Sequence, residues 1–398
     1  MKALSIAVIG AGPVGLALAL LAVRSLPKCE ISLFDARPAE RDVSADARTL
    51  ALSLGSVQLL ERVGAWDAAR AEPVHQVWVS QQAPALAAPG WLGRPEVHLS
   101  ADELAVPMLG AVMGYGALVA PMQRAWEAAA AAEPARLHSR YGAPVAALKD
   151  LGAGVEVDAG VAERFDLAVV AEGGVFGENM LADVRHDYLQ DAWVGSVTLK
   201  GATRGLAVER FTRYGPAALL PTGEQRASLV WCVPRHDDPV RDLDDAQRIA
   251  VLNTVFDARV GRIESVSALN CFPLGLAAQR SLVRGRQVRI GNAAQTLHPV
   301  AGQGLNLGLR DAFALATALR DAVDANRAAP DIDRALSRVA WQRAPDRWAM
   351  IATTDFLARS FTWRAPGIAT LRGVGMAVLD KFPPLKNALA RRMMFGSR

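Results

Sequence analysis

The sequence predicts an α/β fold, in which a Rossmann-like nucleotide-binding domain is interleaved with a second, mostly antiparallel β-sheet domain and followed by C-terminal helices. Two observations support this prediction. A βαβ pattern opens the chain, and a buried strand with a long helix returns near residue 288, after a run of strand-like segments. Because 398 residues exceed one typical hydrophobic core, two domains are expected.

The N-terminal pattern is a strand, a glycine-rich turn, a helix and a second strand. Leu4–Ile9 is a short apolar run with β-branched residues, which favours a buried parallel strand. Gly10–Gly15 predicts the turn, Leu16–Arg24 the helix and Glu30–Phe34 the second strand. Since the glycines interrupt the apolar run, it indicates neither a signal peptide nor a membrane-spanning helix.

The middle of the chain supplies the second sheet. Trp193–Leu199 and Ala227–Val233 predict strands of that sheet, whereas Phe165–Ala171 and Val288–Ile290 predict strands of the nucleotide-binding sheet. Gly304–Val323 predicts a long helix. Further predicted elements are strands at Val74–Ser80 and Ala217–Leu220, a loop at Ala83–Gly93 and a helix at Ala117–Ala132. The domains are expected at 1–75, 100–185 and 280–365 for nucleotide binding, at 76–99 and 186–279 for the second sheet, and at 366–398 for a helical tail.

Composition indicates a globular protein and excludes several classes. Half of the residues are apolar and 21% are charged, which argues against disorder. A formal net charge of +4, without a Lys/Arg cluster near the start of the chain, gives little reason to expect a nucleic-acid partner. Cys29, Cys232 and Cys271 are far apart and the histidines are scattered, so neither a disulfide framework nor a metal site is predicted.

The turn after the first strand fits the dinucleotide-binding pattern G-x-G-x-x-G. Gly10 permits the tight turn, Gly12 lets the backbone approach a pyrophosphate, and Gly15 lets the helix pack closely on the sheet. The helix N-terminus presents unpaired N–H groups and a positive dipole end to the phosphates. Asp35 lies 20 residues beyond Gly15, where a carboxylate can accept hydrogen bonds from ribose hydroxyls. The motif predicts a dinucleotide site without distinguishing FAD from NAD.

A second glycine-containing loop lies between Gly291 and Asp311. A strand ends at Gly291, a loop with Pro299 follows, and Gly302-Gln303-Gly304 opens the long helix. Glycines at a helix start permit close backbone approach to a ligand, and the positive dipole end suits a partial negative charge. In a reduced flavin that charge lies at the N1/O2 edge of the ring, so this loop favours FAD.

This stretch resembles the flavoprotein aromatic hydroxylases, the group that includes para-hydroxybenzoate hydroxylase. Within that group it resembles most the ubiquinone-biosynthesis hydroxylases of the 2-octaprenyl-6-methoxyphenol hydroxylase type. Their pattern G-N-A-A-x-x-x-H-P-x-x-G-Q-G-x-N-x-G-x-x-D is matched at each position from Gly291 to Asp311, with Asn292 in place of the Asp of the wider group. The resemblance covers nearly the whole chain. Further matches are Asp46–Leu52 to D-x-R-x-x-A-L, Phe211–Pro221 to F-T-x-x-G-P-x-A-x-L-P, and Thr354-Asp355 followed by Phe361 to the C-terminal region.

One segment departs from the family's pattern. The wider group has D-G after the strand that ends here at Ala171, often followed by Ser and Arg, and that motif is linked to contact with FAD and with reduced nicotinamide. This chain has Ala171-Glu172-Gly173-Gly174-Val175-Phe176. We expect Glu172 to take the place of the Asp with a longer side chain, whereas the resemblance leaves the contact with NAD(P)H open.

The resemblance implies a FAD-dependent monooxygenase that hydroxylates the aromatic ring of a polyprenylated phenol in ubiquinone biosynthesis. NAD(P)H would reduce the flavin, and a flavin C4a-hydroperoxide would pass its distal oxygen to the ring, so an apolar and closed pocket is expected. No catalytic residue is assigned, and His298 is expected to shape the loop rather than to move a proton. The expected FAD contacts are Gly10, Gly12, Gly15, Asp35, Arg48, Glu172, Gly291, Asn292, Pro299, Gly302, Gln303, Gly304, Leu305 and Asn306, and the expected substrate contacts are Leu220 and Pro221.

Two other functions remain open. A flavin reductase or dehydrogenase without oxygen insertion could use the same fold, because fold does not fix function. A non-catalytic FAD-binding subunit of a ubiquinone-synthesis complex is the third reading, and the altered Glu172 segment is its main support.

The C-terminal tail alternates apolar and basic residues, such as Phe382, Leu389, Lys381 and Arg391. A basic segment with an apolar face binds anionic membrane surfaces, and a polyprenylated substrate resides in the membrane. We therefore expect a cytoplasmic protein with peripheral contact at the inner face of the cell membrane. The alternative for this tail is an ordinary helix packed on the nucleotide-binding domain or on a partner.

Overall fold

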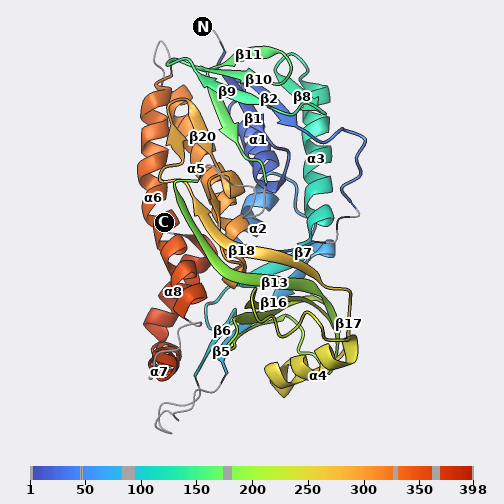
Figure 1. Ribbon diagram of the computed structural model, residues 1–398. Coiled ribbons are helices and arrows are strands. Elements are labelled where there is room, and N and C mark those ends of the chain that lie inside the picture. The colour runs from blue at the N-terminus through green and yellow to red at the C-terminus, as the bar shows by residue number, and fades with distance from the viewer. Residues whose placement is uncertain are drawn as a thin grey trace.

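The computed structural model describes residues 3–44, 46, 48–82, 95–173, 182–325, 330–360 and 368–396, with the side chains of residues 301, 368 and 369 left aside. The described residues do not include the loop predicted at Ala83–Gly93, the segment Gly174–Phe176 or Phe361. Figure 1 shows two bodies, one built around β1, β2 and β20, and one built around β13 and β16. The predicted combination of a Rossmann-like domain and a second sheet is confirmed.

The first body contains a six-stranded sheet in the order β19-β20-β12-β1-β2-β8. All neighbours are parallel except β19 and β20. The strands at its centre are buried apolar runs, as expected for a parallel sheet covered on both faces. The strands are β1 (Ser5–Ile9), β2 (Glu30–Asp35), β8 (Leu137–Tyr141), β12 (Leu167–Val170), β19 (Val283–Arg284) and β20 (Gln287–Arg289).

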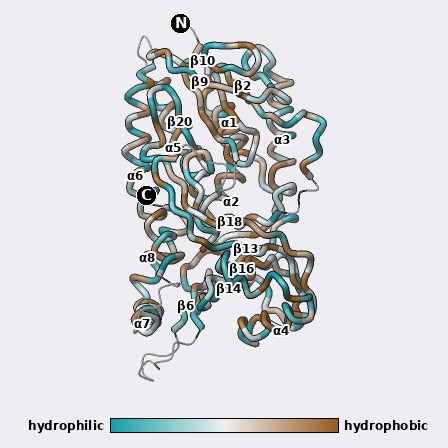
Figure 2. The backbone as a smooth tube through the Cα atoms, viewed as in Figure 1, coloured by the Kyte–Doolittle hydropathy of each residue, from teal (hydrophilic) through white to brown (hydrophobic). Residues whose placement is uncertain are grey.

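Helices cover one face of this sheet and a small antiparallel sheet covers the other. The helical face forms the largest core, and Figure 2 shows its central helix α1 as mostly hydrophobic. The opposite face buries Ile9 and Phe34 against Val155 and Phe165. The helices are α1 (Pro13–Ser25), α3 (Tyr115–Ala132) and α5 (Gln303–Asp324), and the covering strands are β9 (Ala147–Asp150), β10 (Val155–Asp158) and β11 (Ala162–Phe165).

The second body is a nine-stranded, mostly antiparallel sheet. One face packs on α4 through a core that includes Leu219, Leu229 and Leu252. The helix is α4 (Asp245–Val255), and the strands are β5 (Gln76–Gln81), β6 (Glu96–Ser100), β13 (Val184–Lys200), β14 (Leu206–Phe211), β15 (Pro216–Gly223), β16 (Arg226–Pro234), β17 (Arg262–Val266), β18 (Asn270–Ala278) and β21 (Gln295–Thr296).

A small antiparallel sheet and the C-terminal helices complete the described structure. The sheet β3-β7-β4 lies between the two bodies and packs on β15 through Val74, Val112 and Leu220. Within the described residues no helix is both long and apolar enough to span a membrane. The remaining elements are β3 (Thr49–Ser53), β4 (Glu72–Val74), β7 (Gly110–Gly114), α2 (Leu54–Arg62), α6 (Ile332–Ser360), α7 (Ile368–Lys381), α8 (Pro383–Phe395), η1 (Ala68–Arg70), η3 (Ala258–Val260), η4 (Gly291–Ala293) and η5 (Val300–Gly302).

Helix α6 was not predicted, and its buried side chains give the reason. Arg343, Asp346 and Arg347 are nearly fully buried, and they interrupt the apolar periodicity by which a helix is recognised. Arg343 pairs with Asp311 at 2.7 Å and with Asp346 at 2.9 Å, so these charges are compensated within the protein.

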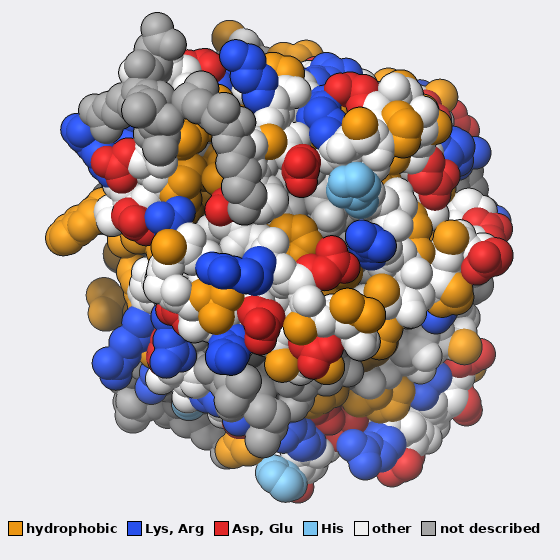
Figure 3. Space-filling view, turned by 90° about the horizontal axis from the view of Figure 1, so that it is seen from above, with side chains coloured by type: hydrophobic (Ala, Val, Ile, Leu, Met, Phe, Trp, Pro, Cys, Tyr) orange, Lys and Arg blue, Asp and Glu red, His pale blue; other side chains and the backbone are white. Residues whose placement is uncertain are grey.

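At the surface, positive and negative side chains are interspersed on the face seen in Figure 3.

Candidate functional site

The first glycine turn (residues 10–15) joins β1 to α1. Gly10 has a φ of +104°, which favours glycine, and its N–H donates to the Phe34 carbonyl at 2.7 Å. A Cβ at position 15 would lie 1.9 Å from the Gly10 carbonyl oxygen, so only glycine fits there. At Gly12 the nearest atom of the described residues to a Cβ would be the Tyr115 hydroxyl, at 3.8 Å. The backbone at Gly12 therefore borders open space, as a pyrophosphate site requires.

Asp35, at the end of β2, is held beside this turn. Its carboxylate accepts hydrogen bonds from the Ala11 N–H at 2.6 Å and from the Arg37 side chain at 2.9 and 3.0 Å. Arg37 also donates to the Ala11 carbonyl at 2.8 Å. Burial raises the pKa of the Asp35 carboxyl, but the hydrogen bonds from Arg37 and Ala11 outweigh burial, and the net pKa is lowered. Asp35 is therefore an ionised acceptor, the state that suits a ribose hydroxyl.

Arg48 lies near the same turn through its contact with Tyr115. Its guanidinium is 4.3 Å from the centroid of the Tyr115 ring and pairs with Asp46 at 2.7 Å. The Arg48 side chain is nevertheless 67% exposed, so it is accessible to a ligand. Because the Tyr115 hydroxyl borders Gly12, the stacking of Arg48 on the Tyr115 ring places a cation near the exposed backbone of the first glycine turn.

Glu172 follows β12 at the same edge of the sheet. A Cβ at Gly10 would lie 2.9 Å from the Ala171 carbonyl carbon and from the Glu172 Cα, so the altered segment begins against the first glycine turn. Partial desolvation, followed by the charge of Asp35, raises the pKa of the Glu172 carboxyl. Glu172 therefore holds a proton more readily than an ordinary glutamate, whereas residues 174–181 lie outside the described structure.

The second glycine loop (residues 291–304) ends at the start of α5. Gly302 is the N-cap of α5 and has a left-handed φ of +57°. A Cβ at Gly304 would meet no atom of the described residues within 4 Å. Within the described residues, no side chain caps the start of α5 or the start of α1 by a hydrogen bond. Both helices therefore begin with backbone N–H groups that border open space.

Two glycines bring the starts of these helices together. A Cβ at Gly308 would lie 2.8 Å from the Gly291 Cα and 2.9 Å from a methyl carbon of Val14. Gly291 itself has a φ of +62° and faces Val14. Because a side chain at either position would separate α5 from α1, glycine there sets their close approach. The two loops follow the carboxyl ends of β1 and β20, at one edge of the parallel sheet.

The side chains of Asn306 and Gln303 are engaged with protein groups. Asn306 accepts from the Ser53 N–H at 2.8 Å and the Ser56 hydroxyl at 2.7 Å, and it donates to the carbonyls of Ala51 at 3.1 Å and Gly302 at 2.9 Å. This uses the full hydrogen-bonding capacity of the amide. Gln303 is buried and accepts from Arg310 at 3.4 Å. A ligand at this helix start therefore meets backbone, while Asn292, Pro299 and Leu305 retain exposed or half-exposed side chains nearby.

His298 is buried within the second glycine loop. Its Nδ1 accepts from the Val300 N–H at 3.3 Å, which leaves the proton on Nε2, 3.1 Å from the Gln190 amide oxygen. Burial lowers the pKa of His298 to about 3. The imidazole is therefore neutral near pH 7, and its hydrogen bonds fit the expected role in shaping the loop.

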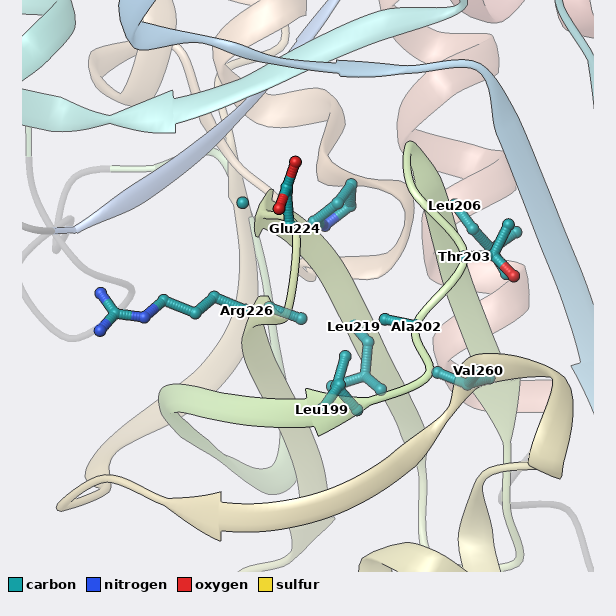
Figure 4. A pocket seen from close by; sticks show the side chains of 11 residues that line it. Leu199, Ala202, Thr203, Leu206, Leu219, Glu224, Arg226 and Val260 are labelled. Atoms are coloured by element: carbon teal, nitrogen blue, oxygen red, sulfur yellow. The ribbon is translucent and has the colours of Figure 1, made fainter.

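The two expected substrate residues point to opposite faces of the nine-stranded sheet. Leu220 packs with Val74 and Val112, on the face toward the first body. Pro221 instead lines a small pocket on the α4 side with Leu199 and Val260, part of which Figure 4 shows. Because adjacent strand residues alternate between faces, both cannot line one pocket. Leu220 is the one of the two that lies on the face toward the first body.

Half-buried apolar side chains lie near Leu220 on that same face. Ala218 pairs with Val230, and Val230 pairs with Val194 on the next strand, which forms a row across β15, β16 and β13. All three are partly exposed. At the end of β14, Phe211 packs on Val300 of the second glycine loop. On this face the sheet therefore presents an apolar row, bordered by Glu209 of β14, which pairs with Ala218.

Taken together, these groups fit FAD. Two uncapped helix starts, an ionised carboxylate at the end of β2 and an exposed arginine suit a pyrophosphate, a ribose and an electron-rich ring edge. The open space at Gly12 and Gly304 is the space that such a ligand needs. Among the described residues, no group of three or more His, Cys, Asp or Glu side chains could hold a metal ion.

Three residues of this site were missed by the sequence reasoning. Arg37 lies two residues after Asp35, so a search for a cation that could pair with the ribose carboxylate would have found it. Tyr115 begins α3 directly after Gly114, another strand-to-helix glycine. Gln190 gives no signal, because its partner His298 is 108 residues away in the sequence.

Comparison with known proteins gives relatives and structural neighbours. The profile of a FAD binding domain family matches residues 163–343. The ubiquinone hydroxylase UbiL of Rhodospirillum rubrum is 30% identical, over 99% of this chain and 90% of that protein. The 3-demethoxyubiquinol 3-hydroxylase of Escherichia coli is 29% identical over 96% of each chain. The p-nitrophenol 4-monooxygenase PnpA of Pseudomonas putida shares the fold, with a TM-score of 0.73, 15% identity and all of both chains covered. Klebsiella pneumoniae HpxO, solved with FAD and uric acid, has a TM-score of 0.71 at 16% identity, over 99% of this chain and 97% of that one.

Proposed function

The chain belongs to the ubiquinone-biosynthesis hydroxylases and is a FAD-dependent monooxygenase, and we propose that its substrate is a polyprenylated phenol whose aromatic ring it hydroxylates. The observation that best supports this substrate is the apolar row of Ala218, Val230 and Val194 beside the second glycine loop. A phenol ring with a prenyl tail is an apolar ligand that such a surface suits.

Each part of the site has a role in this proposal. The first glycine turn, Asp35 and Arg48 hold the pyrophosphate and ribose of FAD, and the second glycine loop holds its ring. When bound, FAD accepts electrons from NAD(P)H and activates dioxygen for insertion into the substrate. The proposed FAD contacts are Gly10, Gly12, Gly15, Asp35, Arg48, Glu172, Gly291, Asn292, Pro299, Gly302, Gln303, Gly304, Leu305 and Asn306, with Gln303 and Asn306 acting through their backbone.

The chain's own contribution to the chemistry is to place the ring and to exclude water. Ala218, Leu220, Val194 and Val230 would line the reacting region with apolar atoms and keep water from it. His298 is neutral and has both ring nitrogens engaged, so it holds the loop and moves no proton in this proposal. No nucleophile is required.

The first test is the visible absorption spectrum of the purified protein. We expect flavin bands that bleach with NAD(P)H under anaerobic conditions and return in air, followed by hydroxylation of a prenylated phenol. Reversible bleaching with no oxygenated product would instead assign a flavin reductase. If the protein bound no flavin after addition of FAD, it would be assigned as a non-catalytic subunit.

We propose further that the protein acts in the cytoplasm, at the inner face of the membrane, through α7 and α8. Leu371, Val378 and Leu385 on these helices, and Phe382 between them, are 46–72% exposed. Lys386 is buried and pairs with Glu103 at 3.0 Å, whereas Lys381, Arg391 and Arg392 are exposed, so both apolar and basic side chains lie at this surface. The same surface would serve a partner in a ubiquinone-synthesis complex.

Liposome flotation tests the membrane contact. The double variant Phe382→Ser, Leu385→Ser should lose binding to anionic vesicles, and Trp341→Ser, which alters an exposed tryptophan of α6, should retain it. Equal binding by both variants and the parent protein would remove the membrane proposal. Absence of vesicle binding by the parent protein would favour a protein partner for α7 and α8.

A further inference from the structure

Strand β13 contains a bulge next to the candidate site. Its pairing with β18 shifts between Asp187 and Gln190, so Tyr188 and Leu189 have no partner in that ladder. Leu189 has a φ of +54°, a left-handed conformation that a bulky residue rarely adopts, and it is 53% exposed. A bulge with a strained residue at this position needs support from its surroundings.

Arg235, directly after β16, supplies that support. Its guanidinium bonds Asp187 at 2.8 and 3.1 Å and Asp191 at 2.9 Å, so it bridges the two ends of the bulge. It also donates to the Gln190 carbonyl at 3.4 Å, and its backbone N–H donates to the Leu189 carbonyl at 2.8 Å. The bulge is therefore held from one side by a single arginine and two carboxylates.

On its other side the bulge presents Tyr188 and Gln190 to the second glycine loop. The Tyr188 ring meets the His298 ring edge to face at 5.2 Å, and its hydroxyl donates to Asp355 on α6 at 3.0 Å. The Gln190 amide oxygen lies 3.1 Å from His298 Nε2. Gln190 is only 3% exposed, so water competes little for these bonds.

The Gln190 amide also reaches the turn between β14 and β15. Its Nε2 donates to the Tyr214 carbonyl at 3.4 Å. That turn is fixed by Thr212, whose hydroxyl donates to the Gly215 carbonyl at 2.7 Å. A chain of hydrogen bonds thus runs from the Val300 N–H through His298 and Gln190 to the turn that precedes the apolar row.

We propose that Gln190 is a positioning residue that sets the second glycine loop in register with the nine-stranded sheet, and that Arg235 acts behind it by holding the bulge. This inference rests on the proposed function, because the register matters if the loop holds the flavin ring and the sheet holds the phenol. An amide suits the position, since it accepts from His298 and donates to Tyr214 at once. A misplacement of about 1 Å between reacting groups can lower a rate roughly 100-fold.

The test compares Gln190→Leu with a matched control, Gln76→Leu. Gln76 also contacts a histidine, His98, at 3.3 Å in the same sheet, but away from the second glycine loop. We expect Gln190→Leu to bind FAD within about twofold of the parent protein, yet to yield about tenfold less hydroxylated product per NAD(P)H consumed. Arg235→Gln should give a smaller loss of the same kind, and Gln76→Leu should give none. Unchanged product yield in Gln190→Leu, or equal losses in Gln190→Leu and Gln76→Leu, would overturn the proposal.

A second variant tests the contact without any substrate. Gln190→Glu places a carboxylate beside His298 Nε2, where the other neighbouring groups are Tyr188 on β13 and Asp355 behind it on α6. The new charge should raise the pKa of His298, so the bound flavin spectrum should gain a titration step between about pH 4 and 7. The parent protein, in which burial keeps His298 neutral, should lack that step. A flat spectrum in Gln190→Glu would contradict the contact, whatever substrate the enzyme uses.

Discussion

The first glycine turn and the second glycine loop do similar work but are built differently. Both leave a helix start uncapped next to open space, at Gly12 and at Gly304. The first is supported by neighbours in sequence, since Asp35 and Arg37 lie within 27 residues of Gly10. The second is supported by Asn306 on Ser53 and Ser56, and by His298 on Gln190, across 108 to 253 residues.

This difference indicates which kind of substitution should disrupt each of the two regions. At the first turn, a glycine itself sets the geometry, because Gly15 leaves no space for a Cβ. At the second loop, buried polar side chains from distant segments set it, so loss of one hydrogen-bonding amide should disturb the loop without touching a glycine. Variants in the two regions should therefore fail in different ways.

The largest effect is expected at Gly12. Gly12→Val should fold, because Gly12 has extended dihedral angles and a Cβ there meets nothing in the described residues closer than 3.8 Å. Its side chain would occupy the pyrophosphate space, so FAD affinity should fall by about 100-fold, or roughly 3 kcal/mol. Fluorescence titration of the FAD-free protein measures the affinity. Gly15→Val is the contrast, since it should fail to fold; FAD binding by a folded Gly12→Val at parental affinity would refute the assigned turn.

Asn306→Leu tests the second loop through stability. Ser53 and Ser56 would lose a buried acceptor, which should lower the free energy of unfolding by about 3 kcal/mol. Denaturant unfolding of the FAD-free protein measures this loss, and the exposed Asn292→Ala should change stability far less. A loss of FAD affinity with unchanged stability would mean that the Asn306 side chain binds the ligand directly.

Arg37→Met tests the first turn through pH. The pKa of Asp35 is lowered in the folded protein, so its ionised form contributes at higher pH and is lost only as pH falls through that lowered value. Without Arg37 the pKa should rise, and FAD affinity should begin to fall at a higher pH than in the parent protein. At pH 7 the loss of the Arg37 hydrogen bonds to the Asp35 carboxylate should lower FAD affinity by about tenfold. Parallel pH profiles for the two proteins would contradict this role of Arg37.

The smallest expected effect is at Gly304. Because Gly304 is in the first turn of α5 with open space beside it, Gly304→Ala should stabilise the FAD-free protein by up to about 1 kcal/mol. The added methyl would face the ligand, so FAD affinity should fall by about threefold. Thermal unfolding and titration together measure both changes, and a tighter complex would place the ligand away from Gly304.

The sequence alone was sufficient to predict the position in the fold of those residues that local spacing defines. Gly10, Gly12, Gly15 and Asp35 follow one another in a βαβ unit, so their positions could be read directly. For Leu220 and Pro221 the sequence was not sufficient. Strand alternation places them on opposite faces of the sheet, and the sequence motif does not indicate which face lies toward the first body. The role of Gln190 could not be predicted from the sequence, because it depends on a bulge at Leu189 and on the distant partner His298.

The central claim is oxygen insertion into a prenylated phenol, and labelled dioxygen tests it most directly. The FAD-loaded protein would be given NAD(P)H and a prenylated phenol under ¹⁸O₂, and the product mass would be measured. We predict a ring-hydroxylated product that contains one labelled oxygen atom. Oxidation of NAD(P)H with release of hydrogen peroxide and recovery of unchanged phenol, for a range of prenylated phenols, would contradict the account.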